Sequence, residues 1–147
     1  SRGPKSLKGI HSFFGIDQLS SFLATTNILV LLLPLTRATR GIISLDRLMQ
    51  LPEGGHVINA GRGSLIVEHD LLLALEAGHI ASVALDVFSE EPLPLGHQFW
   101  GHPKILVTPH IASLTNPDTA ASSIAQNIKR AQEGKAMIGV IDTKAYS

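Results

Sequence analysis

Short apolar runs alternate with amphipathic segments along the whole chain. Four runs rich in β-branched and small apolar residues predict buried strands, at 27–33, 56–59, 80–85 and 104–108. Apolar residues at helical spacing predict four helices, at 17–24, 44–51, 68–77 and 116–133. Because strand and helix alternate, we expect a parallel sheet with right-handed crossovers, in which 27–33 is a central strand that is apolar on both faces.

The composition is typical of one soluble α/β unit. The 147 residues are 44% hydrophobic and 16% charged, which suffices for one buried core but not for two ordinary domains. The formal net charge is zero and no basic block occurs, so neither nucleic acid nor a membrane surface is an expected partner. With no cysteine, the chain has no disulfide framework and no thiolate site. We expect a cytoplasmic protein, and, because no methionine opens the chain, a fragment.

Two acids and a histidine follow neighbouring predicted strands. Asp86 comes directly after 80–85, Glu91 follows in a turn with Pro92, and His110 follows 104–108. Ligands of open parallel sheets bind beyond the carboxyl ends of the strands, so we expect these three side chains to face one crevice. A histidine beside a carboxylate can stay protonated near neutral pH, which makes His110 a candidate general acid. An isolated histidine is more often a hydrogen-bonded turn residue, and the neighbouring acids favour the catalytic interpretation.

Arg62 lies between two glycines in the sequence Asn59-Ala60-Gly61-Arg62-Gly63, at the end of the predicted strand 56–59. Glycine lets backbone approach a ligand, and a guanidinium can bind a carboxylate with two parallel hydrogen bonds. The pentapeptide alone fits a plain turn with a solvated arginine equally well. No GxGxxG occurs in the chain. The other six histidines are expected at the surface and lack metal-ligand spacing, so no metal site is predicted.

Taken together, these motifs resemble the NAD(P)-dependent D-2-hydroxyacid dehydrogenases. The resemblance covers nearly the whole chain and is carried by LLLPLTRATRGII, NAGRG, LDVFSEEPLP, FWGHP and TPHIA. The FWGHP segment, the start SRGPKS and the ending VIDTKAYS look most like the glyoxylate/hydroxypyruvate reductases of the A type. The resemblance implies a Rossmann-type doubly wound parallel sheet. Residues 1–115 would be the C-terminal part of its dinucleotide-binding domain. Residues 116–147 would be a terminal helix and tail that return to a substrate domain.

The same resemblance assigns roles to individual residues. Arg62 would bind the substrate carboxylate and keto oxygen, Glu91 would keep His110 charged, and His110 would donate the proton. Asp86 would lie near the nicotinamide amide, and Arg62 and His110 would also contact the cofactor. Further cofactor-lining positions are Leu33, Pro34, Ala60 and Ala112. Ser1 and Arg2 match a pair that faces the adenosine 2′-phosphate, which favours NADPH over NADH, although Gly3 and Pro4 depart from the family pattern.

The resemblance therefore implies hydride transfer from NADPH to a small 2-keto acid, glyoxylate or hydroxypyruvate, in an intact enzyme that is a homodimer. The family's glycine-rich loop is absent from the 147 residues, so we expect them to be inactive alone. An alternative is an NAD(H)-sensing interaction protein on the same fold, which can retain Arg62, Glu91 and His110. A truncated product without function is a third interpretation.

Overall fold

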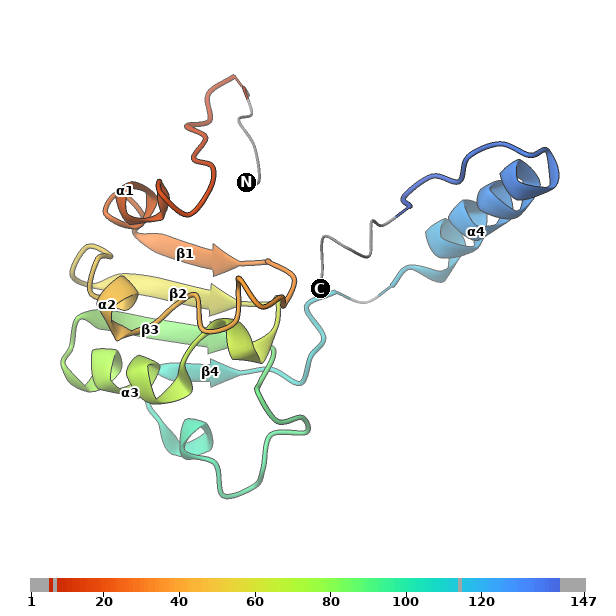
Figure 1. Ribbon diagram of the computed structural model, residues 1–147. Coiled ribbons are helices and arrows are strands. Elements are labelled where there is room, and N and C mark those ends of the chain that lie inside the picture. The colour runs from red at the N-terminus through yellow and green to blue at the C-terminus, as the bar shows by residue number, and fades with distance from the viewer. Residues whose placement is uncertain (1–5, 7, 114, 141–147) are drawn as a thin grey trace. The chain divides into compact units, whose positions relative to one another are not determined.

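The first part of the chain forms a parallel sheet of four strands. The structure is a computed structural model that describes residues 6, 8–113 and 115–140, and it separates into two compact units, Ser1–His110 and Ile111–Ser147. In the first unit the strand order is β1-β2-β3-β4, with all neighbours parallel (Figure 1). The strands are β1 (Ile28–Leu31), β2 (Gly55–Asn59), β3 (Ile80–Leu85) and β4 (Ile105–Val107). The α/β class and all four predicted strands are confirmed.

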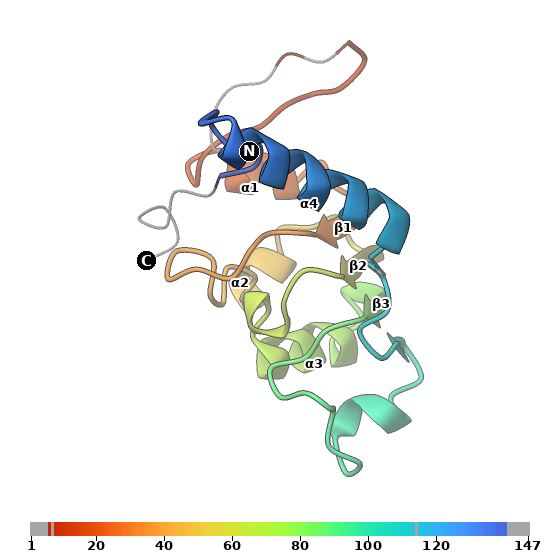
Figure 2. The same cartoon turned by 90° about the vertical axis from the view of Figure 1, so that its right-hand side faces the viewer.

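One α-helix precedes β1, and two further α-helices and two 3-10 turns connect the strands. Their bounds are α1 (Leu19–Leu23), α2 (Leu45–Leu48), η1 (Gly63–Leu65), α3 (Glu68–Glu76) and η2 (Gln98–Gly101). Figures 1 and 2 show α2 and α3 on the same face of the sheet. Leu48 and Leu75 from these helices are at most 1% exposed, and they join buried strand residues such as Val57 and Ile80 in one core. Apolar burial on this face is the main stabilising contribution to the unit.

The prediction that 27–33 is a central strand is wrong for the four-stranded sheet. In the four-stranded sheet β1 is an edge strand, and only Leu29 and Leu31 are buried. Ile28 is 58% exposed, Val30 49% and, on β4, Leu106 63%. A central parallel strand is covered on both faces, whereas α2 and α3 cover one, so the alternate residues of β1 stay open in the described part of the chain.

The strands end together at one edge of the sheet. The register pairs Leu31 with Asn59, Asn59 with Leu85 and Leu85 with Val107, which are the last residues of β1, β2, β3 and β4. The segments that follow all four strands therefore leave from a single line, at the carboxyl edge where ligands of parallel sheets bind.

The start of α2 differs in detail from the prediction. Ser44 is the N-cap, as expected, but its side chain makes no capping hydrogen bond. Asp70 of α3 accepts the hydrogen bond from the amide of Leu45 instead, at 2.8 Å. A carboxylate at a helix N-terminus satisfies an amide that has no partner within the helix, and here it also ties α3 to α2.

The second unit contains α4 (Pro117–Gln132), which confirms the predicted terminal helix. The side chain of Asn116 accepts hydrogen bonds from the amides of Asp118 and Thr119, at 3.0 and 3.2 Å, and Pro117 occupies the first turn. No residue of α4 is buried. Among the described residues, no helix has the length and apolar character needed to cross a membrane.

Gly63 allows two loops of the carboxyl edge to meet. A Cβ atom at this position would overlap the carbonyl group of Phe88 and the amide nitrogen of Ser89. The backbone after β2 thus touches the backbone after β3 directly, and any side chain at position 63 forces the two apart. Among the predicted motif residues, Gly63 is the one whose lack of a side chain the packing requires most strictly.

Replacing Gly63 by alanine should therefore destabilise the protein. We expect Gly63→Ala to lower the free energy of unfolding by about 1 to 3 kcal/mol, the usual cost of overpacking. Gly96→Ala is the matched control, because a Cβ there meets no atom within 4 Å. Chemical denaturation of both variants checks this, and equal stability of the two would contradict the proposed contact.

Candidate active site

The turn after β2 fixes the backbone of Arg62. The side chain of Asn59, which is 1% exposed, accepts from the amide of Gly61 at 3.1 Å and donates to the carbonyl of Arg62 at 2.9 Å. A buried asparagine that bonds its own turn in this way stiffens the backbone that follows. The guanidinium of Arg62 is exposed, and its Nη1 donates to the carbonyl of Gly61 at 2.6 Å.

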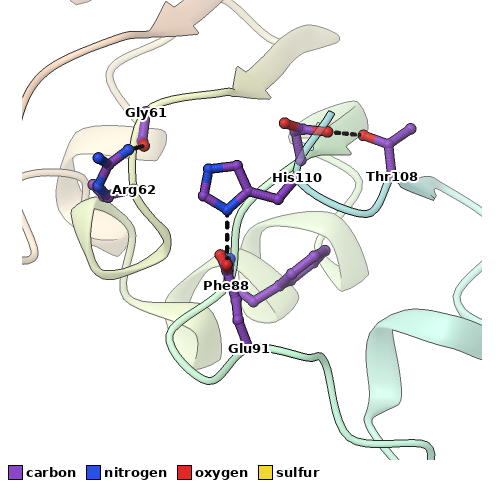
Figure 3. Close-up of polar contacts among 7 residues, drawn as sticks. Gly61, Arg62, Phe88, Glu91, Thr108 and His110 are labelled. Carbon is purple, nitrogen blue, oxygen red and sulfur yellow. Dashed lines mark hydrogen bonds and ion pairs between the residues drawn. The ribbon is translucent and has the colours of Figure 1, made fainter. Parts of the chain in front are cut away.

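Glu91 and His110 form a direct pair at the same edge. Nδ1 of His110 lies 2.7 Å from Oε2 of Glu91. Figure 3 shows the imidazole ring and the carboxylate facing each other. The other carboxylate oxygen, Oε1, accepts from the amide of Phe88 at 2.9 Å. His110 has φ of 55°, a left-handed conformation that non-glycine residues seldom adopt. With both its oxygens bonded, Glu91 holds the imidazole ring in one orientation.

The pair changes the ionisation of Glu91. The hydrogen bond from His110 lowers the pKa of Glu91 below its ordinary 4.5, and the hydrogen bond from the amide of Phe88 lowers this pKa further. Burial opposes the shift, and the charges of His110 and Arg62 add smaller lowering effects. The folded state thus favours the carboxylate. Its stabilising contribution is present above about pH 4.5 and is lost as the pH falls through the lowered pKa. Both side chains are solvent-exposed, so the pair orients the ring more than it stabilises the fold.

Asp86, directly after β3, is held by a hydrogen bond from Thr108, directly after β4. Asp86 is 5% exposed, and its Oδ1 accepts from the hydroxyl of Thr108 at 2.6 Å. The amide of Asp86 donates to the carbonyl of Asn59, so the ladder between β2 and β3 continues into the site. A buried carboxylate that is bonded in this way is held in one orientation at the edge.

The structure brings Arg62, Glu91 and His110 to the same edge, and Figure 3 shows Arg62 on the other side of the His110 ring from Thr108. The remaining predicted cofactor residues lie in several segments of the chain. Leu33 and Pro34 are exposed in the segment after β1, and Ala60 is half-buried directly after β2. Ala112 belongs to the second compact unit, and Ser1 and Arg2 lie outside the described residues. The roles assigned to all of these residues remain proposals.

Several residues that shape the site were missed by the sequence interpretation. Asn59 and Gly63 stand inside the recognised pentapeptide, and the position of a polar residue at the end of a predicted strand was a usable signal for Asn59. Thr108 bonds Asp86 across two strand ends, so only the register reveals it. Among the six other histidines, which were expected at the surface, His79, His97 and His102 are half-buried. The described residues contain no group of three or more histidines and acids placed to hold a metal ion.

The chain is similar to proteins of a known family. Residues 4–112 match the model of the D-isomer specific 2-hydroxyacid dehydrogenase, NAD binding domain. The chain is 49% identical, over 98% of its length, to glyoxylate/hydroxypyruvate reductase A of Photorhabdus laumondii, and it covers 46% of that protein. It is 45% identical to the reductase A of Serratia proteamaculans, of which it covers 45%. The chain thus spans about half the length of the curated relatives it matches.

Solved structures agree with the fold. A D-isomer specific 2-hydroxyacid dehydrogenase of Xanthobacter autotrophicus, solved with NADPH and MES, superposes with a TM-score of 0.95 at 44% identity, over 100% of this chain and 61% of that one. An NADPH-dependent glyoxylate/hydroxypyruvate reductase of Sinorhizobium meliloti, solved with NADP and sulfate, superposes with a TM-score of 0.93 at 35% identity, over 100% of this chain and 48% of that one. The Rossmann-type fold is confirmed, and the chain belongs to the NAD-binding domain family of the D-isomer specific 2-hydroxyacid dehydrogenases.

Proposed function

We propose that this chain carries the catalytic edge of an enzyme that reduces a small 2-keto acid, glyoxylate or hydroxypyruvate, with NADPH. The observation that carries the proposal is the contact of 2.7 Å between His110 and Glu91, at an edge that also holds Arg62. The curated relatives are named as reductases of these acids, which supports the enzyme over the NAD(H)-sensing alternative.

Arg62 suits the carboxylate of the substrate. A guanidinium has five N–H donors in one plane, and Arg62 uses Nη1 for the carbonyl of Gly61. The planar fork matches a carboxylate, so Arg62 can fix the acid group of a 2-keto acid and polarise its keto oxygen. The rigid turn held by Asn59 keeps the arginine backbone in place while the side chain binds.

His110 suits the proton transfer. The carboxylate of Glu91 can only accept, so Nδ1 of His110 carries a proton, and Nε2 carries a second one in the charged ring. A bound reduced nicotinamide would supply the hydride to the carbonyl carbon. His110 then gives the Nε2 proton to the keto oxygen, and the product is a 2-hydroxy acid. The positive charges of Arg62 and His110 stabilise the oxyanion as it forms.

The described residues fit the nicotinamide end of such a cofactor. Asp86 is oriented by Thr108 directly after β3, where an acid suits the nicotinamide amide, and Ala60 adds a small side chain at the same edge. For the intact protein we further propose a homodimer in the cytoplasm with no nucleic-acid or membrane partner. The zero formal net charge supports the absence of a polyanionic partner.

Loss of His110 should abolish most turnover. In the intact protein, His110→Ala is expected to lower kcat for glyoxylate by about two to four decades, because the general acid is removed, with a smaller effect on cofactor binding. His69→Ala is the control, since His69 is exposed on α3. Steady-state NADPH oxidation measures both, and a His110→Ala variant with nearly full activity would refute the assignment of the proton donor.

Preference for NADPH should depend on Arg2. The segment 1–16 contains no acid, which an NAD-specific site uses to bind the ribose hydroxyls. An arginine can instead bind a 2′-phosphate through charge-assisted hydrogen bonds of about 1.5 to 3 kcal/mol each. We expect the intact protein to favour NADPH in kcat/KM, and Arg2→Ala to reduce that preference mainly through KM. Equal kcat/KM for NADH and NADPH in the parent enzyme would contradict the proposal.

A further inference from the structure

Glu68 connects the start of α3 to the loop that carries Glu91. Its Oε1 accepts from the amide of Ser89 at 3.2 Å, and its Oε2 lies 3.6 Å from Nε2 of His97. Glu68 thus spans from the helix that follows Arg62 to two points of one loop. The reduction chemistry described above gives it no part.

The contact to His97 is the weaker of the two. Nδ1 of His97 accepts from the amide of Phe99 at 3.3 Å, so in the neutral ring the proton is on Nε2, the atom that faces Glu68. The ring also packs edge-on against Phe99, with centroids 4.4 Å apart, and Phe99 is 1% exposed. A separation of 3.6 Å is too long for a hydrogen bond, so the bond to Ser89 is the directional one.

The amide of Ser89 is adjacent to the amide that orients Glu91. Phe88 donates to Oε1 of Glu91 at 2.9 Å, and Ser89 donates to Glu68 at 3.2 Å. The backbone of Phe88 and Ser89 is also the part of the loop that touches Gly63. Both successive amides therefore bond to carboxylates, one of the site and one of α3, and the loop is fixed at this turn on both sides.

We propose that Glu68 is a positioning residue that holds the turn at Phe88 and Ser89, so that Glu91 stays against His110. This inference rests on the proposed function, because it assigns Glu68 an effect on the catalytic pair. The length of the side chain at position 68 should matter more than its charge, because its oxygen must lie within hydrogen-bond distance of the Ser89 amide. Glutamine keeps both the length and an acceptor oxygen, whereas aspartate keeps the charge but is shorter by one methylene.

Three variants of the intact protein separate the contribution of side-chain length at position 68 from that of its charge. Glu68→Ala and Glu68→Asp should each lower kcat for glyoxylate about tenfold, the scale of a small displacement of a catalytic group, and leave the KM for NADPH unchanged. Glu68→Gln should retain most of the parent kcat. Glu76→Ala at the other end of α3 is the matched control, because Glu76 is exposed and far along the helix from Ser89.

A second measurement does not depend on any activity. Carbon NMR of the Glu91 carboxyl group, assigned with Glu91→Gln, should show its pKa rising toward 4.5 in Glu68→Ala and Glu68→Asp but not in Glu68→Gln or Glu76→Ala. If the protein reduces no 2-keto acid but these shifts appear, the positioning role stands and the proposed function fails. If Glu68→Ala and Glu68→Asp leave the Glu91 pKa and kcat at parent values, or if Glu76→Ala changes them equally, the positioning role is wrong.

Discussion

The close approach of two backbones at Gly63 is the constraint on which the site depends. Because position 63 has no side chain, the segment after β2 can touch Phe88 and Ser89 after β3. That contact brings the turn of Arg62 beside the loop whose amide at Phe88 orients Glu91. Glu91 in turn contacts His110, which follows β4. The contact at Gly63 therefore helps to align the segments that follow β2, β3 and β4. Apolar burial alone would hold the sheet together without aligning these groups.

The parallel register provides the frame for this contact. Leu31, Asn59, Leu85 and Val107 form a row, so the chemistry that follows each strand starts from the same line. Hydrogen bonds continue the ladder past the strand ends, from the amide of Asp86 to Asn59 and from the amide of Thr108 to Leu85. A site built on such an edge has rigid backbone beneath it, and its loops carry the side chains that meet substrate.

The apolar pattern predicted the elements well because the strands direct apolar residues into one core, at alternate positions in β1 and β2. The same pattern predicted that Asp86, Glu91 and His110 would share an edge, since parallel strands end on one side. The pattern could not predict Gly63, Thr108 or Glu68, because their partners belong to a long loop whose path depends on tertiary packing. The apolar pattern also predicted that 27–33 is a central strand. In the four-stranded sheet β1 lies at the edge and buries one face, and an apolar run by itself reveals neither the strand order nor which face is covered.

Isotope labelling distinguishes direct hydride transfer from the cofactor from uptake of a solvent hydrogen at the carbonyl carbon. The intact protein would be supplied with glyoxylate and NADPH deuterated at C4 of the nicotinamide, on each face of the ring in turn. The arrangement of Arg62, Glu91 and His110 predicts glycolate with one carbon-bound deuterium from one of the two labelled cofactors, while the hydroxyl proton comes from His110 and exchanges with solvent. Glycolate whose new C–H bond takes its hydrogen from deuterated water, or no glycolate at all, would contradict the account.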